Sequence, residues 1–144
     1  MTMLERMQNV LKEQAPPPPI ATLIGFSLAS VEPGETVIEF EAAERHANPM
    51  GTLHGGVFCD IADAAMAMAY ASTLEEGESF TTLELKLNFL KPVWTGKLQA
   101  RGRVVSRGRT VGLAECDVTD DRGRLVARAM ETCMTLRGDQ AQGR

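Results

Sequence analysis

One stretch of the chain, residues 48–70, constrains the fold more than any other: NPMGTLHGGVFCDIADAAMAMAY. It begins with turn-forming residues and continues into a segment, 57–71, in which Asp60 and Asp63 are the only charged side chains. Alanine and methionine dominate this segment and favour a helix over a strand. A helix that is apolar on all sides must be buried, so the rest of the chain has to cover it.

Two glycines stand where this helix is predicted to begin. Gly55 and Gly56 follow His54, and a glycine carries no side chain that would keep a ligand from the free N–H groups of a helix start. Two carboxylates on a buried helix are costly unless they are partnered or used in chemistry. The segment therefore combines a backbone site for a developing negative charge with a buried acid.

Short strands are predicted on both sides of this helix. A hairpin of strands at 25–31 and 35–41 precedes it, with a turn signal at Pro33-Gly34. Four strands follow it, and the short turns between the last of them favour antiparallel pairing. The predicted helix spans 55–72, and the later strands span 81–90, 97–106, 110–119 and 125–136.

These elements predict one α+β domain in which a curled antiparallel sheet covers the helix. The 144 residues are enough for one such core. We expect an N-terminal amphipathic helix and proline-rich linker at 1–19, the domain itself at 20–137, and a disordered tail at 138–144.

Charge is unevenly distributed along the chain. The net charge is −4, with −9 in residues 1–79 and +5 in residues 80–144, where eight arginines lie between 101 and 137. These arginines form either a solvated sheet face or a patch for a phosphorylated ligand. The overall acidity argues against nucleic acid as a partner.

The remaining composition points to a cytoplasmic protein without a metal or cofactor. No apolar run reaches the length of a membrane span, and the N-terminus lacks a secretory pattern. The three cysteines have no metal-like spacing, so we interpret them as reduced core residues. With two histidines and no Cys/His cluster, no zinc site is expected.

The spacing within the helix predicts a dimer. Asp63 lies eight residues after Gly55, about 12 Å along a helix axis, so one small reacting group cannot contact both in one chain. If a second copy of the helix runs antiparallel beside the first, Gly55 of one chain faces Asp63 of the other. A helix N-terminus suits an oxyanion, and a buried carboxylate can act as general base or as nucleophile.

The neighbouring residues have alternative roles that the sequence leaves open. Either Asp60 or Asp63 is functional, or both carboxylates cap a backbone or pair with an arginine. His54 contacts a ligand or bonds to the local turn, and Asn48 either joins the oxyanion site or is a turn residue before a proline. Cys59 has no base at a recognisable spacing, so we place it in the core.

The pattern Asn48-x5-His54-Gly55-Gly56-x6-Asp63 resembles the signature of the hotdog-fold acyl-CoA thioesterases, and most closely that of the phenylacetyl-CoA thioesterase (PaaI-like) subgroup. The resemblance covers roughly residues 20–137. It implies a long helix wrapped by a curled sheet, an acyl-CoA substrate and no cofactor. It also implies active sites formed between two subunits, and dimers that pair into a homotetramer.

The same resemblance implies roles for individual residues. The Gly55 N–H polarises the thioester carbonyl, with Asn48, His54 and Gly56 lining that side. Asp63 of the other subunit activates water or forms an acyl anhydride. Thr82 matches a hydroxyl position that orients the water, although alternation along its strand places it opposite the Leu83 face. Asp60 matches no catalytic position and is interpreted as structural.

CoA carries phosphates far from its thioester, so cations are expected at the mouth of the site. Arg107 and Arg109, on either side of Gly108, are the preferred candidates, because acids flank the similar pair at Arg122. Solvated turn charge is the alternative for both pairs.

Two other functions fit the same fold. One is acyl-CoA hydration, but Met68 stands where one dehydratase type carries glutamate. The other is a non-catalytic acyl-CoA-sensing module, which would be expected to lack the acid and to carry a DNA-binding domain. Because Asp63 is present and residues 1–19 are too short for such a domain, thioester hydrolysis is the preferred interpretation.

Overall fold

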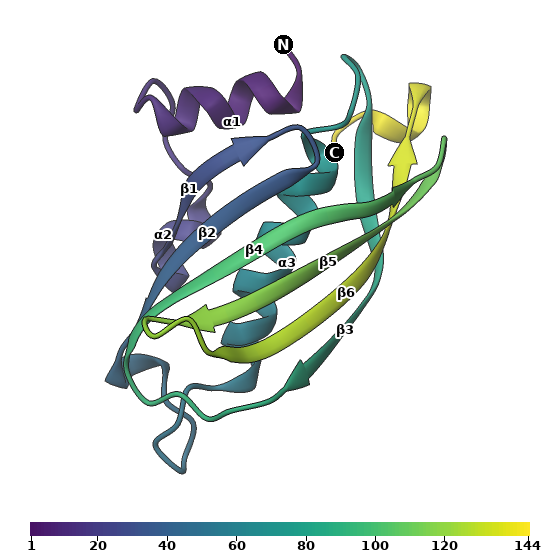
Figure 1. Ribbon diagram of the computed structural model, residues 1–144. Helices are drawn as coiled ribbons and strands as arrows, with labels where there is room; N and C mark the ends of the chain where they lie inside the picture. The colour runs from purple at the N-terminus through teal and green to yellow at the C-terminus, as the bar shows by residue number, and fades with distance from the viewer.

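The computed structural model describes residues 1–144 and confirms the α+β architecture: a curled antiparallel sheet wraps one long helix (Figure 1). The helix is α3 (Gly55–Ala71). The strands are β1 (Phe26–Glu32), β2 (Glu35–Ala42), β3 (Ser79–Phe89), β4 (Gly96–Arg107), β5 (Val111–Asp120) and β6 (Leu125–Leu136). Their order in the sheet is β1-β2-β4-β5-β6-β3, so β1 and β3 are the two edge strands.

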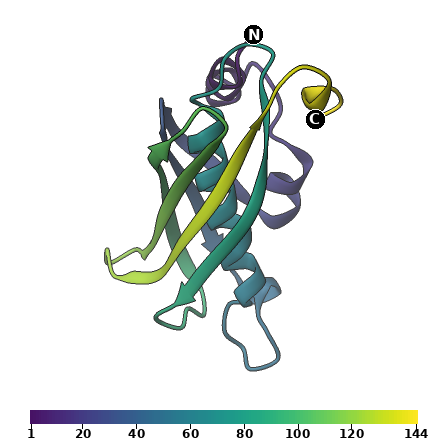
Figure 2. The ribbon, with the colours of Figure 1, turned by 90° about the vertical axis from the view of Figure 1, so that its right-hand side faces the viewer.

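Small residues let α3 pack closely against the concave face of the sheet (Figure 2). Ala62, Ala65 and Ala69 of α3 are fully buried. On β5, a Cβ at Gly112 would lie 2.4 Å from the ring of Tyr70, so only glycine leaves room for that ring. Alanine favours the helix, and its short side chain brings the helix and the sheet together.

Two short helices precede the sheet. A capping box between Thr2 and Glu5 begins α1 (Met3–Leu11), because each residue satisfies a backbone N–H of the other. Pro19 begins α2 (Pro19–Ile24), and Gly25, with a φ of 96°, ends it in the left-handed region. Both helices contact β1, and no α1 side chain is fully buried.

A β-bulge in β3 corrects one expectation about the face of Thr82. The register with β6 shifts between Thr82 and Glu84, so Leu83 is the extra residue and is exposed. Thr82 pairs with the buried Cys133, and Leu85 pairs with Glu131. The bulge thus places Thr82 on the helix-facing side of the sheet, where uninterrupted alternation would have excluded it.

The chain ends lie at the same end of the molecule (Figures 1 and 2). In the tail for which the sequence predicted disorder, Gly138–Ala141 form a short 3-10 helix. The other predicted elements agree with the structure to within about two residues, and the β1–β2 hairpin has the predicted antiparallel pairing. None of the helices has the length and hydropathy needed to cross a membrane.

Candidate active site

The first turn of α3 is arranged around His54 and Gly55. His54 is the N-cap, and its Nδ1 accepts a hydrogen bond of 2.9 Å from the Gly56 N–H. His54 therefore makes the local turn contact, while its Nε2 has no partner within the chain. The Gly55 N–H also donates no hydrogen bond within the chain. A free N–H at a helix start can stabilise negative charge on a ligand.

The loop before α3 is held by Asn48. Its Oδ1 accepts hydrogen bonds from the N–H groups of Met50 and Thr52, and its Nδ2 donates to Thr52 Oγ1 at 2.8 Å. These contacts make Asn48 a turn organiser, which was one of its two expected roles. The second hydrogen of its Nδ2 is not used in these bonds, so the amide still has a donor for a ligand.

A hollow of about 340 Å³ opens beside this helix start. Gly55 and Phe89 of β3 meet there, and a Cβ at Gly55 would lie 2.9 Å from the Phe89 ring. A larger residue here would require the exposed Phe89 ring to move, and glycine keeps the approach to the N–H open. The hollow is lined on one side by the 48–53 loop and on the other by residues 89–93.

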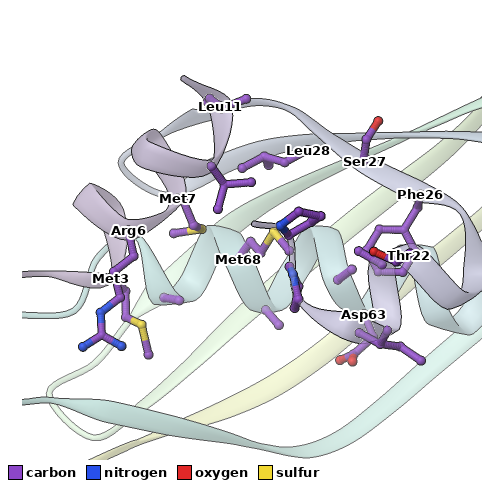
Figure 3. A pocket seen from close by; sticks show the side chains of 18 of the residues that line it. Met3, Arg6, Met7, Leu11, Thr22, Phe26, Ser27, Leu28, Asp63 and Met68 are labelled. Atoms are coloured by element: carbon purple, nitrogen blue, oxygen red, sulfur yellow. The ribbon is translucent and has the colours of Figure 1, made fainter. Parts of the chain in front are cut away.

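Asp63 borders a different and larger cavity of about 840 Å³. This cavity lies between α3, β1 and the two N-terminal helices, and most of its lining is apolar. Figure 3 shows side chains of α1 over one end of the cavity and Asp63 near Phe26 and Thr22 at the other. The sequence predicts the amphipathic helix, and the structure adds that α1 faces a cavity.

The two hollows have no lining residue in common. Gly55 and Asn48 line the smaller one, and Asp60 and Asp63 line the larger one. Within one chain the structure therefore separates the predicted oxyanion donor from the predicted acid, as the helical rise requires.

A buried glutamate that was not among the predicted site residues lies next to Asp63. Glu131 of β6 is 0% exposed, and its Oε1 accepts a hydrogen bond from Cys133 Sγ at 3.2 Å. Burial is the largest cause that raises the pKa of Glu131 to about 9. The contact with the Asp63 side chain and the negative charge of Asp63 raise it further. Glu131 is therefore neutral near pH 7. Thr82 lies next to Cys133. The side chains of Cys133 and Glu131 therefore connect the Thr82 hydroxyl to the Asp63 carboxyl group.

Asp60 has a less defined environment than expected for a structural carboxylate. It forms no ion pair and lines the same cavity as Asp63. Burial is the largest cause that raises the pKa of Asp60. The charge of Asp63 raises this pKa further, and the charge of His54 lowers it. Its neighbour Cys59 is not a reactive thiol, because burial and the two aspartates raise the pKa of this cysteine. No cluster of three metal-ligating side chains is present.

Comparison with known proteins agrees with this geometry. The thioesterase superfamily matches residues 50–127, more than half of the chain. The chain belongs to the thioesterase superfamily. A 1,4-dihydroxy-2-naphthoyl-CoA hydrolase of Listeria monocytogenes is 31% identical over 103 residues, which are 72% of this chain and 84% of the relative. Acyl-coenzyme A thioesterase 13 of Homo sapiens is 26% identical over 134 residues, 91% of this chain and 95% of the relative.

A solved structure extends the comparison to the fold. The phenylacetic acid degradation-related protein of Ralstonia eutropha is 35% identical, with a TM-score of 0.81 over 89% of this chain and 98% of the other. The fold is therefore the hotdog fold of thioesterases, and the expected resemblance to the PaaI-like subgroup is confirmed. The chain is a thioester hydrolase by family.

The arginines of this thioesterase are mostly engaged with acids on the sheet. Five of the eight between 101 and 137 form ion pairs, which supports a solvated sheet face. Arg107 donates to Thr73 Oγ1 at 2.9 Å, and its guanidinium lies 4.7 Å from the centre of the Tyr70 ring. Arg109 is exposed and its guanidinium makes no contact of this kind, so it remains free to bind a phosphate.

Proposed function

We propose that this thioesterase hydrolyses an acyl-CoA ester to the free acid and CoA. One observation carries the proposal: a helix start with a free N–H and a carboxylate on the wall of an apolar cavity lie on the same helix, α3. The first can stabilise the oxyanion of a thioester and the second can activate water. The relatives named for CoA-ester hydrolysis support this substrate class.

The site is completed by a second copy of the chain. With two α3 helices antiparallel, the Gly55 N–H of one subunit faces Asp63 of the partner subunit. The edge strand β3 supports this arrangement, because its outer edge is unpaired and Leu83, Phe89 and Leu90 are each at least half exposed. Pairing of two β3 edges joins the sheets of two subunits and covers these side chains.

In both possible routes of the reaction, negative charge develops on the thioester carbonyl oxygen. The thioester carbonyl oxygen accepts the Gly55 N–H bond, with His54, Asn48 and Gly56 lining this side. Water attacks the carbonyl carbon while the Asp63 carboxylate takes a proton from it, and the C–S bond breaks to release the CoA thiolate. In the alternative route Asp63 attacks the carbonyl carbon first and the C–S bond breaks to release the CoA thiolate, after which water hydrolyses the resulting anhydride. Thr82 orients the water in either route.

The apolar cavity beside Asp63 holds the acyl group. Its lining includes Phe26, Met68 and Phe80 together with Met3 and Met7 of α1, which suits an aryl or medium-chain acyl group. The nucleotide end of CoA extends to the surface, where Arg107 and Arg109 stand at the β4–β5 turn. Because Arg107 is already engaged, Arg109 is the better candidate for a phosphate contact.

Dimers pair into a tetramer through the outer face of the sheet. Val111 and Met130 are exposed there by 47% and 39%. Sedimentation or scattering with mass determination distinguishes a dimer from a tetramer, and a monodisperse dimer would remove this part of the proposal.

The direct test is a hydrolysis screen across a panel of acyl-CoA esters, comparing kcat/KM for wild type and Asp63→Asn. Aryl-acyl, aryl-acetyl and medium-chain esters should be the best substrates. The Asp63→Asn enzyme should be inactive on all of them. If the wild-type enzyme hydrolysed no acyl-CoA in the panel, the proposed function would be wrong.

A further inference from the structure

The proposed mechanism leaves one buried carboxyl group unused. Glu131 is the only acidic residue among the fully buried side chains. It faces α3 from the middle of β6, between Ala129 and Cys133 on the same face of the strand. It pairs across the sheet with Leu85 of β3 and Ala114 of β5. An acidic group in this apolar setting is costly unless it has a specific partner.

The hydrogen bonds of Glu131 identify that partner. Oε1 accepts from Cys133 Sγ, and Oε2 is buried without any hydrogen-bond donor. The remaining polar side chain that acts on the Glu131 carboxyl group is Asp63, through a side-chain contact and through its charge. Two ionised carboxylates are both acceptors and cannot bond, so one of the pair carries a proton.

The surroundings assign the proton to Glu131. From β5 it faces Cys116, from its own strand Cys133, and from β3 the uncharged Thr82. Burial raises the pKa of both thiols, so they remain protonated and neutral and add no thiolate charge beside Glu131. Asp63 lines the cavity and is partly exposed, whereas Glu131 is fully enclosed. The more enclosed carboxyl group is the one that stays neutral.

We propose that Glu131 is a positioning residue for Asp63. Its protonated carboxyl group donates one hydrogen bond to the Asp63 carboxylate and holds that carboxylate so that its other oxygen faces the cavity. The inference rests on the proposed role of Asp63 as base or nucleophile. Glu131 does not itself contact the thioester, and its proton stays on Glu131 throughout the reaction.

Orientation of this kind affects the rate more than the binding of substrate. Asp63 must direct one oxygen at water or at the thioester carbon, and a misdirected carboxylate loses this geometry. A donor on its other oxygen also stabilises the ionised form that the reaction needs. When Glu131 itself ionises, the donor is lost and a second negative charge appears beside Asp63. Activity should therefore fall at alkaline pH.

Two substitutions separate positioning from packing. Glu131→Gln keeps a neutral donor and an acceptor of the same shape, whereas Glu131→Met fills similar volume without either. We expect Glu131→Gln to stay within about 3-fold of wild-type kcat and Glu131→Met to lose about 10- to 100-fold, with little change in KM. Equal losses in the two variants would show a packing role only, and wild-type kcat in a folded Glu131→Met enzyme would also overturn the proposal.

The pH profile gives a second readout if Glu131→Met does not fold. Wild-type kcat/KM should decline as pH rises to about 9 and above. The decline should be absent in Glu131→Gln, which has no proton to lose. A decline of the same size in Glu131→Gln would contradict the proposal.

Carbon-13 NMR of the side-chain carboxyl groups tests the carboxyl pair without reference to catalysis. The Glu131 carbon should titrate near pH 9, apart from the exposed glutamates, and Asp63→Asn should move that titration to lower pH because it removes a neighbouring charge. If Glu131 titrated with the exposed glutamates, this inference would fail. If no acyl-CoA were hydrolysed while the NMR result held, the proposed function would fail and the carboxyl pair would stand.

Discussion

Gly102 of β4 lies directly against the main chain of α3: a Cβ at this position would be 2.3 Å from the carbonyl oxygen of Ala65. The same carbonyl accepts a hydrogen bond from Thr36 Oγ1 of β2 at 2.5 Å. The main chain of β4 faces the main chain of α3 here, so rotation of a side chain cannot remove the clash that a larger residue would cause. This contact sets the distance between the sheet and α3 two residues after Asp63.

Gly102→Ala should therefore lower the free energy of unfolding. We expect a loss of about 1–3 kcal/mol, since the helix must move away from the sheet to admit the methyl group. Urea unfolding measures it. Arg101→Ala on the same strand is the control: its ion pair with Glu35 is about half exposed and contributes at most about 1 kcal/mol. A Gly102→Ala protein as stable as Arg101→Ala would show that this contact is not tight in solution.

Asp63 and Asp60 line the same cavity, so matched amide substitutions distinguish their roles. Asp63→Asn should lower kcat by at least about 100-fold, because the amide is neither a base nor a nucleophile. Asp60→Asn should keep most of the activity and raise stability slightly, because burial disfavours the Asp60 carboxylate. Circular dichroism and single-turnover kinetics check both. Near-wild-type rates in a folded Asp63→Asn enzyme would remove Asp63 from the mechanism.

A composite site can be tested by mixing two inactive chains. Asp63→Asn damages the acid, and Asn48→Ala damages the loop that holds the oxyanion side. In a heterodimer one site carries both lesions and the other carries neither, so the mixture should recover up to about half of the wild-type activity per heterodimer. Heterodimers isolated by two affinity tags provide the measurement. Purified heterodimers without activity would argue for a site within one subunit.

The features that the sequence predicted best are those that repeat along the chain. The apolar run that gives α3 extends over four turns, and each β-strand carries its own alternation, so small local irregularities do not change the assignment. The separation of Gly55 and Asp63 also followed from the sequence, because helical rise is nearly constant. The family signature then supplied roles that no single residue indicates.

The sequence-based prediction was wrong where one irregular residue changes the face of the sheet on which its neighbours lie. The bulge at Leu83 moves Thr82 to the inner side, and nothing in that stretch marks where the register slips. Glu131 does carry a signal in the sequence: it stands in phase with Ala127, Ala129 and Cys133, all buried. A carboxyl group in step with apolar residues on one strand predicts a buried acid. Its contact with Asp63, by contrast, needs the tertiary structure.

The two arginines of the β4–β5 turn should behave differently. Arg109→Ala should raise KM for the CoA ester by about 3- to 10-fold and leave kcat nearly unchanged. A contact far from the reacting carbonyl binds the ground state and the transition state equally. The penalty should shrink with a truncated pantetheine thioester and with added salt. An equal penalty for both substrates would show that Arg109 does not contact the nucleotide.

Arg107→Ala should instead destabilise the fold. Its guanidinium lies over the Tyr70 ring and donates to Thr73, both near the end of α3. Loss of these contacts should lower the free energy of unfolding by about 1–2 kcal/mol. Urea unfolding measures this cost, and Arg109→Ala serves as the matched control that leaves stability unchanged. If Arg107→Ala unfolded like wild type but raised KM, the assignment of the two arginines would be reversed.

The Glu131 carboxyl group also makes stability depend on pH. Its pKa is about 9 in the folded protein, raised by burial and by Asp63 from an ordinary value of 4.5. Below about pH 4.5 the group is protonated in both states and has no effect on the free energy of unfolding. Between these two values the folded state holds a proton that the unfolded state releases, so stability falls as pH rises, by up to about 1.4 kcal/mol per pH unit.

Glu131→Gln removes this dependence, because glutamine does not ionise in either state. The melting temperature of Glu131→Gln should be similar to that of wild type near pH 4.5 and exceed it by a growing margin up to about pH 9. Scanning calorimetry at several pH values measures the margin. The control is Glu84→Gln, which changes an exposed carboxyl group on β3 that accepts from Thr132. Its melting curve should run parallel to that of wild type, and a parallel curve for Glu131→Gln would mean that Glu131 is ionised in the folded protein.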